Sequence, residues 1–162
     1  NKLVQQSFSV GKRVRSSTRI QQGSTSIGSA AVDLAEKIFG QLEGCRVLVI
    51  GAGEMGRVTA QSLKSRGAKS IAVSNRSFDK AEALADELEG KAVPFEAWAD
   101  MLDQVDIVIS STGAPSSIVK KVDVAKGLKR RRGHSLFLID IAVPRDIEND
   151  VNDLDRERKT RA

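Results

Sequence analysis

The residues with the clearest chemical potential form a glycine-rich hexapeptide, Gly51-Ala52-Gly53-Glu54-Met55-Gly56. It has the spacing GxGxxG, follows the apolar run at 46–50 and precedes a segment with helical periodicity. In such a turn the first glycine leaves the strand, the second lets a diphosphate approach the backbone, and the third allows close helix packing. Free N–H groups at the start of the helix would bind the phosphates. The hexapeptide therefore predicts a dinucleotide site rather than an ordinary glycine-rich turn.

The segment after the second apolar run is Ser74-Asn75-Arg76-Ser77. An NAD-binding domain usually has an acidic residue here, which binds the ribose 2′-hydroxyl, but the first acid in this chain is Asp79. Arg76 offers a planar guanidinium to a 2′-phosphate, and its neighbours offer hydrogen bonds. The alternative is an exposed arginine on a turn. We interpret the segment as a determinant for NADP.

Two further loops lie at the carboxyl ends of apolar runs, Ser110-Ser111-Thr112-Gly113-Ala114-Pro115 at the end of residues 106–110 and Ile141-Ala142-Val143-Pro144-Arg145-Asp146 after residues 135–140. The small hydroxyl side chains of the first loop can approach a ribose without steric conflict. In open parallel sheets, ligands bind beyond the carboxyl ends of the strands, and all four loops are predicted to lie there. Pro115 and Pro144 are equally consistent with stiffening of the loops.

The side chains that could act as nucleophile or base are predicted to lie away from this edge. Cys45 precedes the first strand, and six residues at about 3.3 Å each place it roughly 20 Å from Gly51. His134 precedes the last strand, so it is also predicted to lie at the opposite edge of the sheet from the glycine loop. Asp140 lies at the correct edge, where a lone carboxylate more often binds a neighbouring loop. The sequence has no metal-ligand spacing, so we expect neither a catalytic residue nor a metal site.

Alternating strands and helices are needed to position these loops. Apolar runs predict strands at 46–50, 70–74, 91–94, 106–110 and 135–140. Helical periodicity predicts helices at 28–41, 54–66, 78–89, 95–103 and 121–132, the first segment ending at Gly44. This order predicts an α/β fold, with a Rossmann-type doubly wound parallel sheet in a three-layer αβα arrangement. We expect a single NADP-binding domain at 26–155, with an N-terminal helical extension. Residues 1–25 would be the end of a preceding domain and a connector, and 156–162 a disordered polar tail.

Composition excludes several classes of protein. The chain has 162 residues, 40% hydrophobic residues and 4% aromatic residues, with no Tyr, which argues against a stacking platform for nucleic acid. No apolar run approaches the roughly 20 residues of a membrane span. A single Cys fits a reducing compartment, so a cytoplasmic location is expected. The N-terminal segment NKLVQQSFSV has no signal-peptide pattern and indicates an excised fragment.

The net charge of +5 is concentrated in the two ends of the chain and in Lys129-Arg130-Arg131-Arg132, which leaves the remainder acidic. A basic cluster of this kind could bind nucleic acid. A solvated helix terminus, where cations favour the helix dipole, is the preferred interpretation. We expect no DNA partner and no membrane partner.

Seven segments in this order resemble the glutamyl-tRNA reductase family over residues 5–155: GKRVRSST, SAAVDLAEKIFG, VLVIGAGEMG, VSNRS, VDIVISSTGAPSSI, LKRRRG and FLIDIAVPRDI. The combination of SSTGAP with DIAVPRDI is more specific than the glycine loop. The chain has Val105 where the family has Ala. After Asp155 it reads RERKTRA, where the family continues into another apolar strand and a linking helix.

The resemblance implies that NADPH reduces glutamate esterified to tRNA, releasing glutamate-1-semialdehyde for tetrapyrrole (porphyrin and heme) synthesis. It implies a catalytic Cys in an N-terminal domain missing here, through which glutamyl-tRNA would bind, and a homodimer of the full-length protein. Together with the glycine loop, it predicts that the cofactor is lined by Gly51, Ala52, Gly53, Glu54, Met55, Gly56, Ser74, Asn75, Arg76, Ser111, Thr112, Gly113, Ala142, Val143 and Pro144.

Two alternatives stay open. The domain could belong to an enzyme that resembles shikimate dehydrogenase or an amino-acid dehydrogenase. The shikimate type would need a Lys–Asp pair in an upstream substrate domain. The chain could also be a nucleotide-binding module without catalytic activity. An upstream domain with a Cys nucleophile would distinguish glutamyl-tRNA reductase from both.

Overall fold

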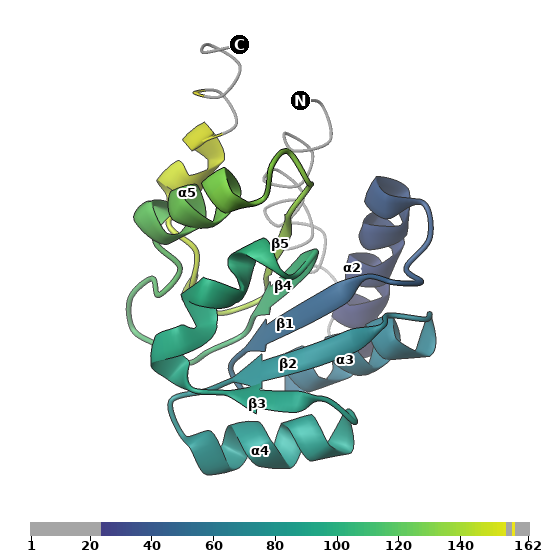
Figure 1. Cartoon of the computed structure of the whole chain (residues 1–162). Coiled ribbons are helices and arrows are strands. Elements are labelled where there is room, and N and C mark those ends of the chain that lie inside the picture. The colour runs from purple at the N-terminus through teal and green to yellow at the C-terminus, as the bar shows by residue number, and fades with distance from the viewer. Residues whose placement is uncertain (1–23, 155–156, 158–162) are drawn as a thin grey trace.

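The computed structural model describes residues 24–154 and residue 157. A five-stranded parallel sheet has the order β3-β2-β1-β4-β5 (Figure 1). The strands are β1 (Arg46–Ile50), β2 (Ser70–Ser74), β3 (Lys91–Val93), β4 (Ile107–Ser110) and β5 (Phe137–Asp140). The chain proceeds outward from β1 to β3 and then crosses to β4 on the other side of β1. The predicted doubly wound sheet is confirmed, with its switch point between β1 and β4.

Helices cover both faces of the sheet, which gives the predicted three layers (Figure 1). One face packs against α2 (Ser24–Phe39), α3 (Glu54–Ser65) and α4 (Phe78–Glu87). The other face packs against the 3₁₀ helix η1 (Phe95–Asp103), α5 (Lys121–Arg130) and the short η2 (Asn149–Asn152). Successive strand residues point to opposite faces. In β1, Val47 and Val49 therefore belong to the first core, and Leu48 and Ile50 to the second.

The bounds of several elements and the type of one helix differ from the sequence prediction. Helix α2 ends at Phe39, not at 41, and Gly40 follows with φ of 78°, a left-handed conformation that commonly ends helices. The segment 95–103 is a 3₁₀ helix, not an α-helix. The predicted N-terminal extension and nearly all of the predicted tail fall outside the described residues.

Arg131 follows α5, which ends at Arg130, and its side chain binds the segment before β5, which begins only at Phe137. Its side chain is buried, with 4% of the residue exposed. The guanidinium donates to four backbone carbonyls, those of Leu102 (2.7 Å), Val105, His134 (3.0 Å) and Ser135. Because two of these carbonyls precede β5, they bind the guanidinium and not a neighbouring strand. Burial lowers the pKa of Arg131. The predicted solvated helix terminus is therefore wrong for this residue.

Candidate functional site

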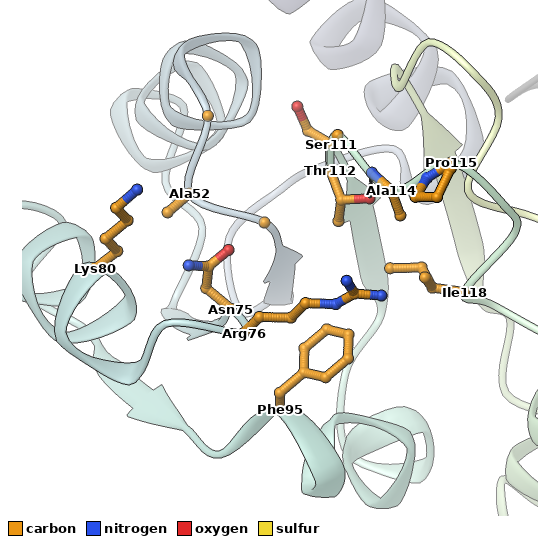
Figure 2. A pocket seen from close by; sticks show the side chains of 13 residues that line it. Ala52, Asn75, Arg76, Lys80, Phe95, Ser111, Thr112, Ala114, Pro115 and Ile118 are labelled. Carbon is orange, nitrogen blue, oxygen red and sulfur yellow. Dashed lines mark hydrogen bonds between the residues drawn. The ribbon is translucent and has the colours of Figure 1, made fainter.

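A pocket of about 340 Å³ lies at the carboxyl ends of β1, β2 and β4, at the switch point of the sheet (Figure 2). The loops after these three strands and the start of η1 provide its walls. The lining residues are Gly51, Ala52, Gly53, Asn75, Arg76, Lys80, Phe95, Ser111, Thr112, Gly113, Ala114, Pro115 and Ile118. Three of the four loops predicted from the sequence thus meet in one cavity.

The three glycines of the turn after β1 have different structural constraints. Gly51 has φ of 102°, and a Cβ there would lie 2.3 Å from the carbonyl oxygen of Ser111. A Cβ at Gly56 would lie 3.1 Å from the Cβ of Ser111. Gly53, in contrast, has an extended backbone, and its nearest neighbour would be 3.6 Å from an added Cβ. The fold therefore requires glycine at 51 but not at 53, so any requirement at 53 would come from a ligand.

The N-terminus of α3 faces the pocket without a capping side chain. Gly53 is its N-cap and makes no side-chain hydrogen bond, whereas Ser77 accepts from the backbone N–H of Lys80 at the start of α4. The first N–H groups of a helix have no partners within the helix and attract anions. The Gly53 end of α3 thus has the donors that a diphosphate requires.

Two hexapeptide side chains do not line the pocket. Glu54 binds Arg57, whose Nε and Nη2 donate to its carboxylate at 3.0 and 2.9 Å. The hydrogen bond from Arg57 lowers the pKa of Glu54. Met55 packs against the first hydrophobic core. The carboxylate of Glu54 is therefore neutralised by Arg57 beside the helix terminus.

The wall after β2 carries two cations. Arg76 and Lys80 extend toward the cavity from the loop and from the first turn of α4 (Figure 2). The guanidinium of Arg76 lies over the ring of Phe95. Ser74 does not line the pocket, because it is buried and its hydroxyl donates to the carbonyl of Pro94 at 3.3 Å. The lining residues include no Asp or Glu, so this wall suits an anionic group.

The wall after β4 is made of small and apolar residues. Ser111 lies next to Gly51, and its backbone N–H donates to the carbonyl of Ile50 at 2.9 Å. The Thr112 hydroxyl donates to Asp146 at 2.5 Å and also accepts from the N–H of Ala114 at 3.2 Å. The hydroxyl hydrogen of Thr112 is therefore already used in a hydrogen bond within the protein. A ligand could contact only the other atoms of this side chain.

The loop after β5 lies at the same sheet edge but does not line the pocket. Ala142 is buried, whereas Val143 and Pro144, joined by a cis peptide bond, are exposed, Val143 to 80%. Asp140 accepts from the N–H groups of Ala142, Asp146 and Ile147 at 3.0–3.1 Å. Burial raises the pKa of Asp140. This carboxylate binds its own loop, as the sequence interpretation expected.

The structure thus brings together about half of the residues predicted from the sequence. The predicted residues that line the pocket are Gly51, Ala52, Gly53, Asn75, Arg76, Ser111, Thr112 and Gly113. Those that do not line it are Glu54, Met55, Gly56, Ser74, Ala142, Val143 and Pro144. The sequence analysis missed Lys80, Phe95 and Ile118, and it placed Ala114 and Pro115 in a loop at this edge without assigning them to the cofactor. Lys80 could have been predicted from the sequence, because a cation in the first turn of the helix after Arg76 faces the same loop. Phe95 had no such local signal.

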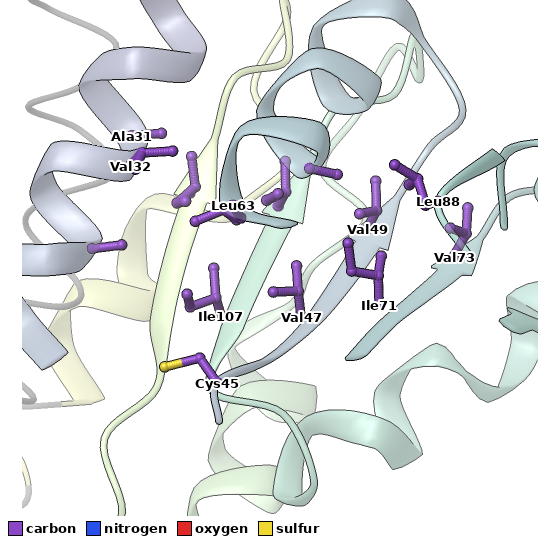
Figure 3. Packing of buried hydrophobic residues seen from close by; sticks show 14 of the residues in the cluster. Ala31, Val32, Cys45, Val47, Val49, Leu63, Ile71, Val73, Leu88 and Ile107 are labelled. Atoms are coloured by element: carbon purple, nitrogen blue, oxygen red, sulfur yellow. The ribbon is translucent and has the colours of Figure 1, made fainter. Parts of the chain in front are cut away.

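Cys45 and His134 lie at the opposite edge of the sheet. Cys45 precedes β1 and packs beside Val47 and Ile107 in the core (Figure 3). Burial, followed by the charge of Asp106, raises the pKa of the thiol, which disfavours the reactive thiolate. Within 24–154 and 157, no group of His, Cys, Asp or Glu side chains could hold a metal ion. In the same part of the chain, no helix has the length and apolarity to cross a membrane.

The strand order, the glycine turn and the open N-terminus of α3 define the Rossmann class of domains, which bind nicotinamide dinucleotides. The fit with such a cofactor rests on this chain's own atoms, namely uncapped N–H donors, an open position at Gly53 and two cations across the cavity. The chain belongs to the family described as shikimate / quinate 5-dehydrogenase, whose model matches residues 33–160.

The curated relatives agree on a narrower resemblance. The glutamyl-tRNA reductases of Akkermansia muciniphila and Syntrophus aciditrophicus are 48% and 49% identical to this chain over 155 residues. Each match covers 96% of this chain. The chain spans only 46% and 37% of these two relatives. The resemblance to glutamyl-tRNA reductase is thus confirmed over a stretch that is less than half the length of these two relatives.

Solved structures give the same result. Glutamyl-tRNA reductase from Methanopyrus kandleri is 42% identical, with a TM-score of 0.75, over 93% of this chain and 43% of that chain. The nucleotide-binding domain of glutamyl-tRNA reductase from Thermoplasma volcanium has a TM-score of 0.58 at 19% identity, over 82% of this chain and 93% of that chain. At this identity the second match shows the fold alone.

Proposed function

We propose that this chain is the NADPH-binding domain of a glutamyl-tRNA reductase. The observation that carries the proposal is a single pocket in which the uncapped N-terminus of α3 faces Arg76 and Lys80, with no acidic side chain in the lining. A diphosphate fits the first feature and a 2′-phosphate fits the second. The names of the relatives supply the reaction.

The pocket residues would divide the cofactor among three subsites. Gly51, Ala52 and Gly53 present backbone to the diphosphate. Asn75, Arg76 and Lys80 surround the 2′-phosphate, the two cations supplying charge-assisted hydrogen bonds. The residues that would border the nicotinamide end are Ser111, Thr112, Gly113 and Ala114. When bound, the nicotinamide supplies hydride to the glutamyl carbonyl carbon. A contact between the cofactor and the loop residues Ala142, Val143 and Pro144 stays a prediction, because these residues lie outside the pocket.

The activity of the whole protein extends beyond this chain. A glutamyl-tRNA reductase must bind tRNA, capture its glutamyl group on a thiolate and release glutamate-1-semialdehyde. Cys45 is buried at the far edge of the sheet, so this function would fall to the rest of the protein. We place tRNA binding and homodimer formation there as well. The role of this chain is to hold and orient the reduced cofactor.

A fluorescence titration of the 162-residue chain with NADPH and with NADH tests the cofactor assignment. We expect NADPH to bind at least about tenfold more tightly, because only NADPH carries the phosphate that Arg76 and Lys80 would bind. Equal affinities would contradict NADPH as the cofactor. No binding of either nucleotide would contradict the assignment of the pocket.

The family match favours a second candidate, an NADP-linked dehydrogenase of the shikimate type. Its chemistry would be reversible oxidation of a ring hydroxyl instead of reduction of an acyl group. A full-length protein that contains this chain separates the two when it is assayed with shikimate plus NADP⁺ and with glutamyl-tRNA plus NADPH. We expect turnover only of glutamyl-tRNA. Turnover of shikimate alone would favour the second candidate.

A further inference from the structure

Asp146 lies outside the pocket but is fully buried directly behind one of its walls. Its carboxylate accepts three hydrogen bonds, one from the last residue of β4 and two from the loop that follows. Oδ2 accepts from the Ser110 hydroxyl and from the Thr112 N–H, both at 2.8 Å, and Oδ1 accepts from the Thr112 hydroxyl at 2.5 Å. A buried carboxylate is costly unless such donors satisfy it. Asp146 therefore binds the start of the Ser111 loop.

The backbone of the same residue binds the other end of that loop. The carbonyl oxygen of Asp146 accepts from the N–H groups of Ile118 at 2.7 Å and Val119 at 2.9 Å. The segment between these two attachments, 111–118, contributes six of the pocket's lining residues, and we call it the wall segment. One residue thus holds both ends of the wall segment.

Asp146 is itself fixed to the sheet. Its backbone N–H donates to Oδ2 of Asp140, the last residue of β5, at 3.1 Å, and the N–H of Ile147 donates to the same oxygen at 3.0 Å. The chain of contacts runs from β5 through Asp140 and Asp146 to Thr112, and from the Thr112 hydroxyl to the N–H of Ala114. The position of the wall segment is therefore set by the end of β5.

A carboxylate suits this position better than an amide. All three of its partners donate, and a carboxylate accepts at both oxygens. In Asp146→Asn, the amide oxygen could keep two donors, but the NH₂ group would then face the Thr112 hydroxyl. That hydroxyl would have to accept from the amide while it also accepts from Ala114. The substitution keeps the shape of the side chain, removes its negative charge and leaves the Thr112 hydroxyl hydrogen without its acceptor.

We propose that Asp146 is a positioning residue, which holds the wall segment in the geometry that the dinucleotide requires. The inference rests on the proposed function, because the proposed function supplies the dinucleotide that the wall segment would contact. Asp146 acts through Thr112 and Ile118 and does not touch the cofactor. Its removal should weaken NADPH and NADH equally, because the wall segment lies across the cavity from the 2′-phosphate subsite.

Amide hydrogen exchange of the free protein and cofactor titration together test the proposal. In Asp146→Asn we expect exchange at Thr112 and Ala114 to accelerate by at least about tenfold, with exchange in β1 unchanged. Both cofactor affinities should fall by about tenfold or more. Glu148→Gln is the matched control, because this half-buried carboxylate accepts from the N–H of Lys121 and not from the wall segment. It should leave exchange and affinity within about twofold of wild type.

Thr112→Val and Thr112→Ser provide the test if Asp146→Asn does not fold. Valine removes the hydroxyl that links Asp146 to Ala114, and serine retains it. We expect the valine variant to accelerate exchange at the Ala114 N–H and to weaken both cofactors, and the serine variant to keep the wild-type exchange rate at Ala114. Faster exchange with unchanged affinities would overturn the positioning role, as would unchanged exchange. If the wild-type protein binds neither cofactor, the proposed function fails, and the exchange data alone then decide whether Asp146 holds the wall segment.

Discussion

The guanidinium carbon of Arg76 lies 5.7 Å from the centroid of the Phe95 ring, across the loops that follow β2 and β3 (Figure 2). A cation over an aromatic face is attracted to the ring, and a planar guanidinium also stacks on it. This contact holds an otherwise exposed side chain beside the cavity. The arginine is therefore partly ordered before a phosphate arrives, which reduces the entropy that binding would cost.

The first prediction concerns cofactor selectivity. Arg76→Ala should remove a charge-assisted contact to the 2′-phosphate and weaken NADPH by roughly 1.5–3 kcal/mol, with little effect on NADH. Parallel titrations with the two nucleotides measure the difference. Arg66→Ala is the control, because Arg66 binds Glu36 at the far end of α3 and does not line the pocket. An equal loss for both nucleotides in Arg76→Ala would refute the assignment of the 2′-phosphate subsite.

Features carried by short, local patterns were predictable from the sequence. The apolar runs predicted β1, β2, β4 and β5, because strands buried on both faces need continuous hydrophobic residues, whereas the predicted edge strand β3 is short and begins with an exposed Lys91. The glycine loop and Arg76 were found because their chemistry is readable within a few residues. Phe95 and Ile118 were missed because apolar side chains enter the pocket only through tertiary packing. Arg131 was misassigned for the same reason, since its four carbonyl partners come from segments that only the fold brings together.

The second prediction separates glycines needed by the fold from those needed by the ligand. Gly53→Val should abolish binding of both nucleotides and change the free energy of unfolding by less than about 1 kcal/mol, because its backbone is extended and open. Gly51→Ala should instead destabilise the protein by at least about 2 kcal/mol, because of its positive φ and the contact with Ser111. Urea unfolding and titration measure the two effects. Near-normal cofactor affinity in Gly53→Val would show that the loop does not bind the diphosphate.

The third prediction tests the buried arginine. Arg131→Met should lower the free energy of unfolding by roughly 2–4 kcal/mol, because it leaves buried carbonyls without a donor. Arg130→Met should cost less than about 1 kcal/mol, because Arg130 forms only a partly exposed pair with Asp103. Chemical denaturation of the two variants gives the comparison. Equal losses would show that the guanidinium of Arg131 contributes no more than a surface charge.

The last prediction is that the 162-residue chain binds NADPH but does not reduce glutamyl-tRNA. A thiol that captures the glutamyl group must lie beside the nicotinamide end of the pocket, with the reacting carbons within about 3.5 Å. Cys45, the chain's single Cys, lies before β1 (Figure 3), and six extended residues separate it from Gly51 by roughly 20 Å. Because Cys45 is packed in the core, no motion within the folded sheet closes that gap. Cys45→Ser should leave NADPH affinity unchanged. If the chain formed glutamate-1-semialdehyde and Cys45→Ser abolished it, then the position of this thiol and the need for another domain would both be wrong.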